Sequence, residues 1–229
     1  MKAKHGRKTG LILVAAGCLL LIFAAGILLM NIRENDQAQQ AAANAAEAIL
    51  HQLPKEVSLS ITREVTLQSS AFIDESSHAD GSAAEVPLGK MPVVSIEGDD
   101  YIGIISIPSI GIKLPVMSEW SYPNLKKAPC MFMGSVYERN AIIAAHNYKS
   151  HFRGIMGLSP GDKVIFYDLA GNEFRYTVAF CEVLQPTDID AMTSSGFDLS
   201  LFTCTIGGKT RYTVRCSISN IIPAETKYQ

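Results

Sequence analysis

The sequence predicts an all-β domain, a barrel or sandwich, behind one membrane-spanning helix. Two observations carry this prediction. Residues 11–30 contain no charged side chain. The C-terminal half contains roughly six short runs of β-branched and aromatic residues in about 120 positions, with turn residues between them and little helical periodicity. The composition, 48% hydrophobic and 18% charged, is sufficient for a packed core.

The N-terminal segment has the pattern of a membrane anchor. Residues 1–10 are basic and contain no acidic residue, and twenty apolar residues in a helix span about 30 Å, the thickness of the hydrocarbon core. We therefore expect a cytoplasmic tail at 1–10, a transmembrane helix at 11–32 and the remainder outside the membrane. Two alternatives are a cleaved signal peptide and a lipoprotein site at Cys18, but the apolar run continues well beyond Gly17, longer than a secretory signal requires.

Charge and cysteine content limit the partners and cofactors. A formal net charge of -2 gives no electrostatic reason to expect nucleic acid. The chain has five cysteines, one of them in the apolar segment, which does not resemble the framework of a disulfide-stapled domain. We expect no cofactor and no metal.

Between anchor and domain, residues 33–98 are expected to form a stalk and spacer. Residues 35–53 are rich in Ala, Gln and Asn and predict at most a marginal helix. The following residues contain apolar patches too short for a core, although 56–67 alternates enough to add a peripheral strand. We expect the folded domain at 99–222 and a short tail at 223–229.

Within the domain, each strand is predicted from an apolar run that ends at turn residues. Two hairpins are expected, the first around residues 168–172 and the second around residues 206–210, where Gly207 and Gly208 favour a tight turn. Short helices are compatible with residues 150–158 and 187–193. The expected strands are 101–107, 112–116, 141–145, 164–167, 173–184, 199–205 and 211–219.

Three residues whose side chains could take part in catalysis stand at strand ends: His146, Cys204 and Arg211. A thiolate can attack a carbonyl, an imidazole can transfer the proton of a leaving amine, and a guanidinium can stabilise an oxyanion. Each has a purely structural alternative, because cysteines in strands are commonly core residues. His151 competes with His146, and Arg215 lies on the same strand face as Arg211.

Three ordered motifs resemble the sortase family. Residues 101–108, Tyr-Ile-Gly-Ile-Ile-Ser-Ile-Pro, resemble its first strand, and residues 142–147, Ile-Ile-Ala-Ala-His-Asn, its histidine segment. Residues 200–204, Ser-Leu-Phe-Thr-Cys, are similar to the signature Thr-Leu-x-Thr-Cys, and Arg211 matches the signature arginine. This chain departs from the family in Ser200 for threonine, in Ala145 for the glycine before the histidine, and in its short Cys-to-Arg loop.

The resemblance implies a closed, mostly antiparallel sortase-type β-barrel with short helices, and a transpeptidase at the outer face of a Gram-positive cell membrane. Cys204 would be the nucleophile, His146 the general acid and base, and Arg211 the residue that orients substrate and oxyanion. The substrates would be exported proteins with a sorting signal similar to Leu-Pro-x-Thr-Gly, and the acceptor an amine of a cell-wall precursor.

Several alternatives stay open at this point. The absence of an Asp-Pro pair disfavours the pilus-building sortases and leaves a class D-like or class B-like enzyme. An L,D-transpeptidase usually shows Ser-x-Gly-Cys, where Phe-Thr-Cys stands here. The last alternative is a catalytically inactive, membrane-anchored binding or regulatory barrel, which a disulfide between Cys204 and Cys216 would favour.

Overall fold

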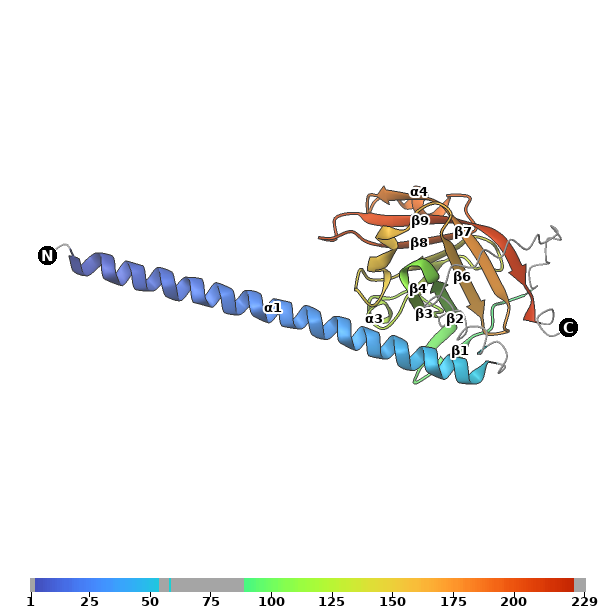
Figure 1. Ribbon diagram of the computed structural model, residues 1–229, viewed down its shortest axis with the longest axis horizontal. Coiled ribbons are helices and arrows are strands. Elements are labelled where there is room, and N and C mark those ends of the chain that lie inside the picture. Colours follow the sequence, from blue (N-terminus) through green and yellow to red (C-terminus); the bar gives the residue numbers. More distant parts are fainter. Residues whose placement is uncertain (1–2, 54–57, 59–88, 225–229) are drawn as a thin grey trace. The chain divides into compact units, whose positions relative to one another are not determined.

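The computed structural model describes residues 3–53, 58 and 89–224 (Figure 1). The chain divides into two compact units, residues 1–37 and residues 38–229. Apart from residue 58, the strand expected at 56–67 lies outside the described residues.

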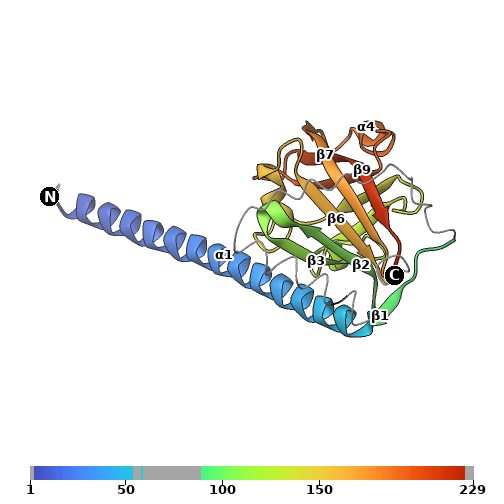
Figure 2. The same ribbon diagram turned by 45° about the vertical axis from the view of Figure 1, so that its right-hand side comes forward.

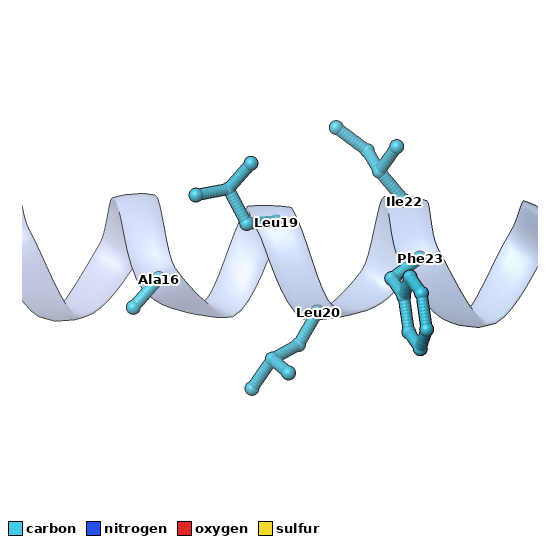
Figure 3. Close-up of a pocket in the computed structure, with 5 residues that line it drawn as sticks. All are labelled: Ala16, Leu19, Leu20, Ile22 and Phe23. Atoms are coloured by element: carbon cyan, nitrogen blue, oxygen red, sulfur yellow. The ribbon is translucent and has the colours of Figure 1, made fainter.

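The long helix α1 (Ala3–Gln52) contains a stretch that is long and apolar enough to cross a membrane. Large apolar side chains in this stretch are exposed, among them Leu19, Leu20, Ile22 and Phe23. Figure 3 shows these side chains leaving the helix in different directions. A helix that is apolar on all sides needs an apolar surrounding, so this stretch fits the anchor expected at 11–32.

The last part of α1 belongs to the second unit and packs there. Its buried residues recur every three or four positions and so lie on one face of the helix. Ala45, Ile49 and Leu53 share a core cluster with Tyr101 and Ile104 of the sheet. The segment expected to be a marginal helix is thus helical and partly buried. The buried residues of this face are Ala38, Ala42, Ala45 and Ile49, and the buried Leu53 follows directly after the end of the helix.

One nine-stranded sheet forms the domain, in the order β1-β2-β3-β4-β5-β8-β9-β7-β6. An additional pairing of β2 with β6 closes the strands from β2 to β9 into a ring, and only the β3–β4 and β5–β8 pairs are parallel. Figure 2 looks onto the wall of β9, β7, β6, β2 and β3. The strands are β1 (Val94–Ile96), β2 (Asp99–Ile107), β3 (Ile112–Met117), β4 (Cys130–Met133), β5 (Ala141–Ala144), β6 (Lys163–Asp168), β7 (Glu173–Leu184), β8 (Leu199–Cys204) and β9 (Arg211–Ile222).

The predicted closed, mostly antiparallel arrangement of strands is confirmed, and every predicted strand of the domain is present. Strands β1 and β4 were not predicted, because each is short and carries no clear alternation. The short helices are η1 (Pro108–Ile110), α3 (Tyr122–Leu125), η2 (Phe152–Gly157) and α4 (Ile189–Thr193), of which η2 and α4 match the expected ones.

Gly103 is required where β2 closes the ring against β6. It pairs with Asp168 at a bulge in β2. A Cβ atom at this position would collide with the carbonyl oxygen of Tyr167 and the ring of Phe166. Only glycine therefore permits the two backbones to approach closely enough for closure.

Strand β8 lies between two apolar clusters of the domain. Leu199 and Leu201 of β8 belong to the large core cluster. Phe202, one residue further on, packs with Ile142 and Met192 in a smaller cluster. Successive side chains of a strand point to opposite faces. Phe202 and Cys204 therefore share one face of β8, opposite to the face on which Leu199 and Leu201 meet the large core cluster.

Candidate active site

Cys204 and Arg211 form a cross-strand pair. Cys204 ends β8, Arg211 begins β9, and the two lie directly opposite each other in the antiparallel ladder. Both side chains are half-buried. The hairpin of β8 and β9 (Figure 1) thus makes Cys204 and Arg211, which the sequence predicted as a pair, partners on adjacent strands.

The turn of this hairpin depends on two glycines. Gly207 and Gly208 have φ of 88° and 74°, in the left-handed region that favours glycine. The Thr205 amide donates to the Thr210 carbonyl at 3.0 Å, and the Gly208 amide donates to the Thr205 carbonyl at 2.8 Å. These bonds fix the register that makes Cys204 and Arg211 partners.

His146 is aligned with Cys204 by the parallel pairing of β5 with β8. Ala144 pairs with Phe202, and the same offset continues past the strand end. The Thr203 hydroxyl donates to the Ala145 carbonyl at 2.8 Å, and the Asn147 side-chain amide donates to the Thr205 carbonyl at 3.3 Å. His146 therefore lies at the level of Cys204, on the segment that directly follows β5.

The two arginines of β9 have different surroundings. Arg211 is half-buried, and its Nη1 donates to the carbonyls of Gly208 and Thr210, both at 3.2 Å. Arg215 is completely buried. Its guanidinium donates to Glu182 Oε1 at 2.7 Å, to Ser200 Oγ at 2.8 Å and to the α4 carbonyls of Ala191 and Met192 at 2.6 and 3.2 Å.

These contacts indicate that Arg215 has a structural role. Its donors are directed to three elements, β7, β8 and α4, and not to a surface that a substrate could reach. Ser200, the residue that replaces the signature threonine, supplies one of the acceptors. Of the two arginines, Arg211 is the one whose surroundings suit contact with a substrate.

The competing histidine is also buried. His151 has no exposed surface, and burial, with a smaller effect of His146, lowers its pKa to about 4. An inaccessible imidazole cannot exchange protons with a substrate, so the geometry favours His146.

All five cysteines are free. Cys216 pairs with Leu199 at one end of the β8–β9 ladder and Cys204 pairs with Arg211 at the other. Their separation is roughly 16 Å at the rise of a strand, well beyond the reach of a disulfide. Burial raises the pKa of the Cys130 thiol to about 12 and raises that of Cys216 further.

The arrangement suits nucleophilic chemistry on a carbonyl. A thiol, an imidazole and a guanidinium project from three neighbouring backbone segments whose register is set by the sheet. Within residues 3–53, 58 and 89–224, no group of three or more His, Cys, Asp or Glu side chains is arranged to hold a metal ion. Sequence reasoning had no signal for the Asn147 contact or for the role of Thr203 in holding the backbone before His146.

Comparison with known proteins gives the family. The sortase domain model matches residues 105–219. Sortase A of Bacillus anthracis is 29% identical over 137 residues, which cover 57% of this chain and 65% of that protein. The match thus spans slightly less than two thirds of this relative.

Solved sortase structures are also similar. The sortase D5 transpeptidase of Clostridium perfringens is 27% identical, with a TM-score of 0.48 over 52% of this chain and 79% of that chain. Sortase C of Clostridium perfringens is 22% identical, with a TM-score of 0.48 over 79% of this chain and 99% of that chain.

The fold, the hairpin with its thiol and guanidinium, and the matching domain model define a sortase-type protein. The chain belongs to the sortase family. This is a family of cysteine transpeptidases that attach proteins to the cell wall.

Proposed function

We propose that this chain is a membrane-anchored cysteine transpeptidase with Cys204 as nucleophile, His146 as general acid and base, and Arg211 as the residue that orients substrate and oxyanion. It cleaves a C-terminal sorting signal similar to Leu-Pro-x-Thr-Gly on exported proteins and transfers them to an amine of a cell-wall precursor. The observation that carries this proposal is the pairing of Cys204 with Arg211, with His146 at the same level on the segment that follows β5.

The first half of the reaction forms a thioester. The Cys204 thiolate attacks the threonine carbonyl carbon of the sorting signal, and the oxyanion that develops accepts hydrogen bonds from Arg211. The carbon–nitrogen bond to glycine breaks as the His146 imidazolium donates its proton to the departing amine.

In the second half, the acceptor amine resolves the thioester. His146, now neutral, takes a proton from the attacking amine, the carbon–sulfur bond breaks, and the thiolate of Cys204 returns. The carboxyl group of the threonine is then joined to the acceptor by a new amide bond, and the enzyme is unchanged.

The apolar part of α1 is the proposed anchor, with the N-terminus in the cytoplasm and the barrel outside the cell. The support is the basic tail before it and the exposed apolar surface of the helix. Anchoring confines enzyme, exported substrate and lipid-linked acceptor to one surface and so raises their effective concentration. It also puts the thiol in the compartment where sorting signals appear.

Thiol labelling combined with mutagenesis tests the proposal. The full chain in detergent is reduced, labelled mildly with iodoacetamide and mapped by mass spectrometry. Among the cysteines of the domain, the proposed nucleophile Cys204 should react before Cys130 and Cys216, because these two are buried. Cys204→Ala should abolish cleavage of a fluorogenic Leu-Pro-x-Thr-Gly peptide. The matched control is Cys181→Ala, which removes another half-buried thiol and should retain cleavage.

The second candidate is an inactive binding or regulatory barrel of the same fold. It predicts no cleavage of any sorting peptide by the wild-type chain, and equal rates for wild type and Cys204→Ala. An unlabelled Cys204 in reduced, folded protein would favour this candidate and count against the transpeptidase.

A further inference from the structure

The imidazole of His146 is stacked on an aromatic ring. The ring centroids of His146 and Tyr148 are 4.7 Å apart and their planes are inclined by 30°. The Tyr148 ring packs in turn on His151, at 5.4 Å and 46°. We propose that Tyr148, supported by His151, is a positioning residue that holds the His146 imidazole in its productive orientation. This role rests on the proposed transpeptidase function.

The backbone around the stack is fixed by its own hydrogen bonds. The amides of His151 and Arg153 both donate to the Tyr148 carbonyl, at 3.0 and 3.2 Å, and the Phe152 amide donates to the His146 carbonyl at 3.1 Å. Phe152 is completely buried in the main core cluster. The loop that carries the three rings is therefore tied to the core, as a positioning device requires.

His151 gives the stack a rigid and uncharged base. Its ring is completely buried, and neither ring nitrogen reaches a partner with normal hydrogen-bond geometry. The backbone groups of Lys127 and Ala38 lie close enough to raise its pKa, but burial has the larger effect and lowers the pKa to about 4. Near neutral pH His151 is therefore uncharged and acts as an aromatic surface.

Stacking restricts the orientation of the His146 ring. His146 is half-buried and stands beyond the end of β5, where the sheet no longer supports its side chain. Proton transfer requires one ring nitrogen within hydrogen-bond reach of the reacting amine. A neighbouring aromatic face limits rotation of the imidazole. Loss of the stack should therefore affect the chemical step more than substrate binding.

Two substitutions at one position test this inference in the full chain in detergent. Tyr148→Leu removes the ring and should lower kcat for the sorting peptide about fivefold with KM unchanged, the size expected for one aromatic pair. Tyr148→Phe keeps the ring and should retain the wild-type kcat. His151→Leu should lower kcat in the same direction, and His151→Phe should not.

A second readout does not depend on catalysis. In proton NMR spectra, ring current from Tyr148 should shift the His146 ring protons upfield, and the His146→Gln variant assigns these signals. The shift should disappear in Tyr148→Leu and persist in Tyr148→Phe. Unchanged His146 signals in a folded Tyr148→Leu variant would overturn the inference, as would an equal loss of kcat in Tyr148→Phe. Wild-type protein that cleaves no peptide but shows the shift would overturn only the proposed function.

Discussion

Cys204 lies directly opposite Arg211 in the β8–β9 ladder, joined by a turn that contains two glycines in left-handed conformation. This pairing makes the distance between thiol and guanidinium a property of strand register and not of a flexible loop. Substitutions that alter the register should therefore affect activity even where they leave both side chains in place.

The first prediction concerns Arg211. Arg211→Lys should lower kcat/KM for a sorting peptide by about a hundredfold or more, because one ammonium cannot replace the planar fork at a developing oxyanion. The melting temperature should stay close to wild type, since the hydrogen bonds that Arg211 makes with the described residues go to carbonyls of its own turn. Peptide-cleavage kinetics and a thermal melt measure the two effects. Wild-type kcat/KM in this variant would assign the role to another residue.

The second prediction concerns Arg215, for which stability should respond first. Arg215→Met should lower the free energy of unfolding by about 3 kcal/mol, because it leaves the partner groups of a buried guanidinium without a donor. Denaturant titration measures this change. The matched control is Lys127→Met, which removes an ion pair with Asp99 in which both side chains are partly exposed and should cost less than about 1 kcal/mol. Equal effects at both positions would contradict the structural assignment.

The third prediction concerns Thr203, whose hydroxyl holds the carbonyl just before His146. Thr203→Val keeps the shape but removes the donor, which leaves a buried carbonyl unsatisfied at a cost of about 1 to 3 kcal/mol. We also expect kcat for the sorting peptide to fall about tenfold, because the backbone just before His146 is no longer held by this hydrogen bond. Thr203→Ser retains the hydroxyl and should recover most of the activity. The rates of peptide cleavage by the two variants test this prediction. Equal rates would mean that the hydrogen bond from Thr203 to the Ala145 carbonyl does not position His146.

The fourth prediction is a pH dependence of stability caused by His151. Its pKa is about 4 in the folded protein against an ordinary value of 6.5, so the unfolded chain binds the proton more readily. The stabilisation is complete above pH 6.5 and is lost as the pH falls from 6.5 toward 4, by about 3 kcal/mol in total. Denaturant titrations between pH 7.5 and 4.5 should show this loss in wild type and a smaller one in His151→Phe. Parallel curves would exclude His151 as the cause.

The fifth prediction tests whether the end of α1 is part of the folded domain. Ile49 has no exposed surface and packs with Tyr101 and Ile104. Ile49→Ala should therefore lower the free energy of unfolding of the full chain by about 2 to 4 kcal/mol. Gln52→Ala, on the exposed face of the same helix, should be nearly neutral. A neutral Ile49→Ala would mean that residues 38–53 serve only as a stalk.

Much of the fold was predictable because it depends on local patterns. The strand runs, the Gly207–Gly208 turn and the apolar segment each satisfy a rule that operates over a few residues. Strand β4 has no such pattern, because it is short and is stabilised mainly by pairing with β5. The packing of residues 38–53 was missed for a similar reason: a face built largely of alanines gives little hydrophobic signal until a partner surface is known.

The sequence by itself determined the family motifs, the apolar helix and the three candidate catalytic residues, His146, Cys204 and Arg211. Only the tertiary structure shows how the surroundings of Arg211 and His146 differ from those of their competitors, Arg215 and His151. Arg215 and Arg211 share one strand face, and their different burial arises because α4 covers one and not the other. His151 likewise differs from His146 through burial alone. Burial depends on contacts between segments far apart in the chain, which no local pattern encodes.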